Sequence, residues 1–145
     1  MQDLWYAYNA SLAKVSAVEN ILWSIALQPI SRSMISASEA RGGNMLGLSP
    51  SPPEGVIVAI FTAAFTQAAD FDKVNRAADD LLADYLAVTK KHGVHRDWVD
   101  LNHAGVEQDP IASYGPVNHE FLRKTARKFD PNGVFQTLKP GGFKL

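Results

Sequence analysis

The residues best suited to contact a flat polar ligand lie in the last third of the chain. The run 98–102 favours a short strand that ends at Asn102, with His103 next to it and a loop beyond. An Asn amide donates and accepts hydrogen bonds in one plane, which suits the edge of a heterocycle. Local backbone hydrogen bonds in a turn are the alternative role for Asn102, and the residues alone favour that role.

Other kinds of chemistry lack their sequence signals. The spacing of the four histidines does not suit a metal site, no His-Glu-x-x-His motif occurs and cysteine is absent. No Gly-x-Ser-x-Gly elbow presents a nucleophile, and no Rossmann or P-loop signature cradles a phosphate. We therefore expect neither a metal site nor a hydrolase triad.

The composition is that of one ordinary globular domain. The chain has 145 residues, of which 46% are hydrophobic and 20% charged, and its formal net charge is -1. Without a long basic run, nucleic-acid binding is not expected. No apolar run is long enough to span a bilayer, and the N-terminal residues lack the pattern of a signal peptide. We expect no membrane association and, by default, a cytoplasmic location.

The first half of the chain predicts a helix and two strands. Apolar spacing favours a helix from Asp3 to about residue 17, capped by Asp3. A strand is expected over 19–27, with Pro29 ending it. Residues 29–55, including the Ser-Pro run 49–53, predict a long connection, and a second strand is expected over 55–62.

The second half predicts two helices. A helix over 72–92 has one apolar stripe and a glycine stop at Gly93. Pro116 begins a final helix. Four of its residues are expected to face the core, namely Val117, Phe121, Leu122 and Phe129. The order of elements indicates an α+β fold, with helices packed on a small antiparallel sheet.

Two further groups of residues could line a ligand site. Trp23, Phe61 and Phe65 could form an aromatic pocket, although core packing is the more common role for aromatic residues in strands. The segment Gly42-Gly43-Asn44 could form a binding loop or a simple turn.

Several motifs of the tail occur in an order typical of one enzyme family. The motifs are Gln108-Asp109-Pro110, Tyr114-Gly115-Pro116-Val117-Asn118, Phe129-Asp130-Pro131 and Phe135-Gln136. Together with Asp100-Leu101-Asn102-His103, they resemble the C-terminal end of the berberine-bridge-enzyme-like (PCMH-type) FAD-linked oxidoreductases. Earlier segments at 42–48 and around Trp23 resemble the same family. The two tyrosines that flank the Asn in that family are replaced here by Asp100 and His103.

The resemblance implies a division of the chain and a cofactor. Residues 1–96 would belong to a substrate domain, and residues 97–145 would complete the FAD domain. Asn102 would approach the isoalloxazine ring of FAD, with His103 and Asn118 as further contacts. A protonated His103 could stabilise the negative charge of a reduced flavin. Tyr114 and His103 are candidate acid–base residues, but the sequence identifies no catalytic base.

The leading hypothesis is therefore the C-terminal part of an FAD-dependent oxidoreductase that oxidises a small organic substrate by hydride transfer to flavin. Its main flavin-binding half would be supplied by a missing FAD-domain chain, or the chain would form a homo-oligomer. Because that half is not in these residues, enzymatic activity of the chain alone stays open. A non-catalytic small-molecule or protein-binding α+β module, or a cofactor-free enzyme that reuses the substrate pocket, are the alternatives.

Overall fold

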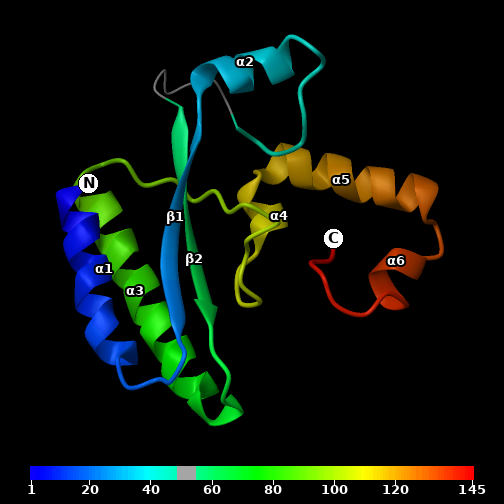
Figure 1. The fold of residues 1–145 in the computed structure, drawn as a ribbon. Helices are drawn as coiled ribbons and strands as arrows, with labels where there is room; N and C mark the ends of the chain where they lie inside the picture. Colours follow the sequence, from blue (N-terminus) through cyan, green and yellow to red (C-terminus); the bar gives the residue numbers. More distant parts are fainter. Residues whose placement is uncertain (49–54) are drawn as a thin grey trace. The chain divides into compact units, whose positions relative to one another are not determined.

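The computed structural model describes residues 1–48 and 55–145 and confirms the α+β class. Two strands form an antiparallel sheet (Figure 1). The elements in chain order are α1 (Gln2–Val15), β1 (Leu22–Ile30), α2 (Arg32–Glu39), β2 (Val56–Ala64), the 3-10 turn η1 (Ala68–Asp70), α3 (Phe71–Lys91), α4 (Pro110–Ser113), α5 (Pro116–Phe129) and α6 (Val134–Thr137).

The chain divides into two compact units. Unit 1 contains residues 1–28 and 59–96, and unit 2 contains residues 29–58 and 97–145. The division passes through both strands, so each strand contributes residues to both units. The expected assignment of residues 1–96 to a substrate domain and 97–145 to a flavin domain stays a prediction.

Unit 1 is built on the packing of α1 against α3. The predicted apolar stripe of α3 is buried, and Val74 and Leu81 are each only 1% exposed. Helix α1 contributes Val15, which is 2% exposed. Gly93 has a φ of 66°, as expected of a left-handed residue just after a helix. The expected helices therefore form, and they bury their apolar faces on each other.

Asp3 does not cap α1, contrary to the prediction. The N-cap is Met1, and no side chain caps the first turn. The Asp3 carboxylate instead accepts a hydrogen bond from His92 Nε2 at 2.9 Å. The α1–α3 packing brings this histidine to the start of α1, and sequence periodicity carries no information about such a partner.

Pro29 does not end β1, which continues through Ile30. Each strand of a two-stranded sheet has one unpaired edge. A proline whose missing N–H would point to that edge removes no ladder hydrogen bond, so the sheet can accommodate it. The second strand was predicted correctly, and it extends two residues further, to Ala64.

The long connection predicted over 29–55 contains the helix α2, which was not predicted. The Ser31 hydroxyl caps this helix by accepting a hydrogen bond from the Met34 backbone N–H at 3.3 Å. A serine before a helix is a recognised start signal, and Ile35 is its only buried residue, so the short segment gave little periodicity. The Ser-Pro run 49–53 lies outside the described residues.

The segment 98–102 is not a strand, and this prediction was wrong. The Val99 N–H donates to Ser113 Oγ at 3.0 Å, and the Leu101 N–H donates to the Tyr114 hydroxyl at 3.3 Å. Because side chains accept from these amides, the segment needs no partner strand. The segment ends in a turn at 101–103.

Pro116 begins α5 as predicted, but α6 follows, so α5 is not the last helix. The expected core contacts of α5 are also wrong, since none of its residues is buried. A turn follows α5 at 130–133. Asp130 accepts hydrogen bonds from the backbone N–H groups of Val134 and Phe135, and Gly133 has a φ of 65°.

Candidate functional site

The loop that carries Asn102 and His103 is held by the short helix α4. Asp109 caps this helix by accepting a hydrogen bond from the Ala112 N–H at 3.0 Å. Pro110 and Ile111 are buried, which fixes the helix in unit 2. Ser113 and Tyr114, at its end, provide the side-chain oxygens that bind the backbone of the 98–102 segment. The loop is thus positioned by side chains rather than by a sheet.

Tyr114 is the centre of this cluster. Its ring stacks on Trp98, with the centroids 6.1 Å apart. The indole N–H of Trp98 donates to the Leu46 carbonyl oxygen at 2.6 Å. Gly47, with a φ of 72°, lies so close to the Tyr114 carbonyl that a side chain there would overlap it. The structure therefore brings the segment 46–47 next to the site.

The Tyr114 hydroxyl is buried, and burial raises its pKa above the ordinary value of 10.0. The hydrogen bond from the Leu101 amide opposes this shift, and the charge of Asp100 adds to it. A raised pKa keeps this hydroxyl protonated at neutral pH. The hydroxyl accepts the Leu101 N–H and so helps to position the loop, while its role as an acid–base residue stays a prediction.

His103 forms an ion-pair contact with Asp100 across the turn. The distance between His103 Nδ1 and Asp100 Oδ2 is 2.5 Å. The side chains are 43% and 20% exposed, respectively. A carboxylate at position 100 would oppose a flavin that gains negative charge. The imidazole that faces this carboxylate would offset the repulsion in its protonated form.

Asn102 is exposed in the same turn, and no hydrogen bond of its side chain is found within residues 1–48 and 55–145. Asn118 lies in the first turn of α5. Its amide nitrogen donates to the Tyr114 carbonyl oxygen at 2.9 Å. Asn102 and His103 are therefore neighbours, whereas Asn118 bonds to the Tyr114 backbone and has one amide donor already engaged.

Trp98, Ser113 and Tyr114 position the loop, and the sequence did not single them out for this role. Tyr114 was noted only as part of a motif and as an acid–base candidate. The Ser113-Tyr114-Gly115 sequence gives no signal for hydrogen bonds to residues twelve or more positions earlier. Only the aromatic character of Trp98 and Tyr114 hinted at a packed cluster.

The other candidate residues have structural roles. Asn44 donates to Ser38 Oγ at 2.6 Å and accepts from the Leu46 N–H at 2.8 Å, so it closes a turn. Trp23 and Phe61 border a cavity of about 50 Å³ in unit 1, which has room for a water molecule but not for an aromatic substrate. These contacts favour core packing for both aromatic residues.

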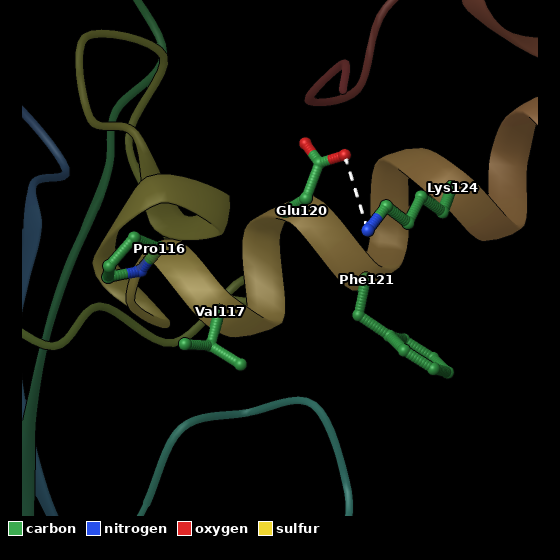
Figure 2. A pocket seen from close by; sticks show the side chains of 5 residues that line it. All are labelled: Pro116, Val117, Glu120, Phe121 and Lys124. Carbon is green, nitrogen blue, oxygen red and sulfur yellow. Dashed lines mark ion pairs between the residues drawn. The ribbon is translucent and has the colours of Figure 1, made fainter.

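The described residues do not form a flavin site by themselves. Of the two best-formed hollows in residues 1–48 and 55–145, one is the small cavity of unit 1. The other is a shallow apolar depression on α5, lined by Pro116, Val117, Glu120, Phe121 and Lys124 (Figure 2). Neither encloses an isoalloxazine ring. The exposed turn at 101–103 has the polar groups to contact one edge of such a ring.

Among the described residues, no group of three or more His, Asp and Glu side chains is arranged to hold a metal ion. Within the same part of the chain, every helix is too short or too polar to cross a bilayer.

Sequence comparisons relate the chain to fungal flavoproteins. The FAD-dependent monooxygenase tpcD of Cochliobolus heterostrophus is 33% identical over 121 residues, which are 83% of this chain and 23% of that protein. The FAD-dependent monooxygenase sdcF of Emericella nidulans is 39% identical over 116 residues, which are 74% of this chain and 22% of that protein. A protein with a different name, the oligopeptidase PhomG' of Diaporthe leptostromiformis, is 29% identical over the whole chain but only 12% of its own length is covered.

No protein-family profile and no solved structure matches the chain. Several relatives that share 33–39% of their aligned residues with this chain are named FAD-dependent monooxygenases. The chain spans about a fifth to a quarter of the length of these relatives. Over most of its length, it is therefore similar to one segment of FAD-dependent oxidoreductases.

Proposed function

We propose that this chain is the C-terminal part of an FAD-dependent oxidoreductase of the berberine-bridge-enzyme-like type. The observation that carries the proposal is the similarity to FAD-dependent monooxygenases over most of the chain. The ordered tail motifs from Gln108 to Gln136 support the finer assignment to this type. The whole enzyme would oxidise a small organic molecule, with hydride transfer to the flavin.

In this proposal, residues 1–96 belong to the substrate domain and residues 97–145 complete the flavin domain. The turn that carries Asn102 and His103 faces the flavin. Asn102 supports this role because its amide is exposed and has no partner within the described residues. Asn118 is a weaker contact because its amide nitrogen already donates to Tyr114.

The rest of the flavin site would come from the part of the relatives that this chain does not span. FAD supplies the redox chemistry of such enzymes, and the protein supplies placement and electrostatics. In this chain, the side chains of Asp100, Ser113 and Tyr114 would hold the turn at 101–103 in place. Asp100 orients His103, while Ser113 and Tyr114 hold the backbone on either side of Asp100.

A chimera tests the proposal directly. The segment of the Emericella nidulans monooxygenase that matches this chain is replaced by residues 1–145, and the visible spectrum is recorded after free cofactor is removed. We expect a retained flavin band. A folded chimera without flavin, beside a parent monooxygenase that retains it, would contradict the proposal.

A pair of asparagine variants sharpens the test. Asn102→Ala in the chimera should shift the flavin band or weaken flavin retention, because a polar contact to the ring is lost. Asn132→Ala is the matched control, since Asn132 is an exposed turn residue outside the cluster. Equal spectra for both variants would show that Asn102 does not contact the ring.

A further inference from the structure

Helix α5 carries an apolar ridge that the rest of unit 2 leaves uncovered. The ridge is formed by Val117 and Phe121, with Phe129 at the end of the helix, and these side chains are 80%, 54% and 75% exposed. Residues four apart lie on one side of a helix, and Val117 and Phe121 project from the same side in Figure 2. Isolated exposed apolar residues are ordinary, but a row of them on one helix marks an interaction surface.

Basic side chains outnumber acidic ones near this ridge, and Glu120, the acidic residue of α5, pairs with Lys124 at 4.0 Å and Arg127 at 3.1 Å. Residues 116–145 contain six Lys and Arg residues but only two Asp and Glu residues, whereas the whole chain has a net charge of -1. Lys128 lies beside the ridge, with its Nζ atom 5.1 Å from the centroid of the Phe129 ring. Lys124 lines the same hollow as Val117 and Phe121. An apolar patch with an acidic rim would complement such a surface.

The sequence relatives indicate which part of a larger protein covers the α5 ridge. Most of their length lies outside the part that this chain spans, and the described residues alone do not enclose a flavin. A second copy of this chain is a poorer occupant. A two-fold contact through the ridge would place the basic side chains of both copies together, and like charges repel.

We propose that the α5 ridge docks on the flavin-binding part of the oxidoreductase, the part of its relatives that this chain does not span. The inference rests on the proposed function and adds the contact surface and its chemistry. The occupant presents an apolar patch with an acidic rim. The ridge then buries Val117, Phe121 and Phe129 against that patch, and Lys124 and Lys128 pair with the rim.

Hydrogen exchange of the α5 backbone tests the inference without relying on activity. The amides of residues 116–129 are compared in the isolated 145-residue chain and in the chimera with the Emericella nidulans monooxygenase. We expect exchange about tenfold or more slower in the chimera, because a docked helix opens less often. If the chimera is insoluble, the isolated chain is instead mixed with the separately produced remainder of that monooxygenase.

Variants of the ridge give a second measurement. Val117→Ala/Phe121→Ala should weaken binding of the chain to that remainder about tenfold or more, because two apolar side chains lose their buried contacts. Lys124→Glu/Lys128→Glu should weaken it mainly at low salt. Met34→Ala is the control, since Met34 is 58% exposed but lies in α2. Circular dichroism should show unchanged folding of the isolated variants.

The outcomes separate this inference from the proposed function. A chimera that retains flavin while its α5 exchanges as fast as in the isolated chain would overturn the inference and leave the proposed function standing. A folded chimera that slows α5 exchange but binds no flavin would support the contact surface and contradict the proposed function. An isolated chain that sediments as a dimer, and dissociates in the Phe121→Ala variant, would assign the ridge to a second copy and overturn the inference.

Discussion

Helices α3 and α5 are both amphipathic, yet only α3 buries its apolar face. Four residues of α3 are buried within unit 1, and no residue of α5 is buried within the described part of the chain. The comparison shows that an apolar stripe predicts that a face will be covered but does not identify what covers it. For α3 the cover is α1, and for α5 we assign it to another part of a larger protein.

The largest expected difference between the two regions is the loss of unfolding free energy when a leucine is replaced by alanine. Leu81 is 1% exposed in α3, and Leu138 is 74% exposed after α6. Leu81→Ala should lower the free energy of unfolding by about 2–5 kcal/mol, because it leaves a cavity in a packed core. Leu138→Ala should change it by less than about 0.5 kcal/mol. Urea denaturation of both variants measures the difference, and equal losses would mean that the tail after α6 is packed in the isolated chain.

The same contrast explains how much the sequence could predict. Helices α1 and α3 and the two strands were predicted because their apolar spacing or β-favouring composition is a local signal. Asp3 and the segment 98–102 were misassigned because their partners lie far away in the sequence. His92 is 89 residues from Asp3, and Ser113 is 14 residues from Val99.

The candidate site was predicted only in part. Asn102 was expected at the end of a strand with His103 next to it, and the structure instead places both residues in one turn. Their contact with a flavin stays a prediction, since it depends on residues outside this chain. The pairing of His103 with Asp100 was not predicted, because His103 was considered as a flavin contact and acid–base candidate and Asp100 only as a departure from a family pattern.

A glycine pair probes how tightly unit 2 is packed around Tyr114. Gly47 and Gly43 have similar positive φ values of 72° and 77°, but only Gly47 lies against the Tyr114 backbone. Gly43→Ala should cost about 1–2 kcal/mol for the left-handed conformation alone. Gly47→Ala should cost more, by about 1–3 kcal/mol, because its Cβ atom would overlap the Tyr114 carbonyl. Thermal unfolding of both variants gives the comparison, and indistinguishable midpoints would show that the 46–47 segment moves away from Tyr114 freely.

Two tryptophans sharpen the contrast at the level of single hydrogen bonds. The Trp23 indole donates to Ser11 Oγ at 2.9 Å in unit 1, and the Trp98 indole donates to the Leu46 carbonyl in unit 2. Ser11 is 2% exposed, so water cannot replace the lost donor in Trp23→Phe. We expect a loss of about 1 kcal/mol for Trp23→Phe.

Trp98→Phe should cost less than about 0.5 kcal/mol, because Leu46 is 40% exposed and water can bind its carbonyl oxygen. The two variants are compared by urea denaturation under identical conditions. A larger loss for Trp98→Phe would reverse the ranking and would place the tightest hydrogen bonding in unit 2.

The smallest expected effect is the pH dependence of the Asp3 contact, which joins the start of α1 to the end of α3. The hydrogen bond from His92 is the main cause that lowers the pKa of Asp3 below its ordinary value of 3.8, with burial opposing and Lys91 assisting. A lowered pKa means that folding favours the carboxylate.

The resulting stability is present above pH 3.8 and is lost as the pH falls through the lowered value. Asp3→Asn should therefore flatten the acid side of the stability curve slightly, since exposed ion pairs contribute little. Asp79→Asn, at an exposed α3 carboxylate with no ion pair found among the described residues, is the control. The free energy of unfolding of both variants is measured from neutral pH to below pH 3.8. If both follow the wild-type curve, the Asp3–His92 contact adds no stability to the packing of α1 against α3.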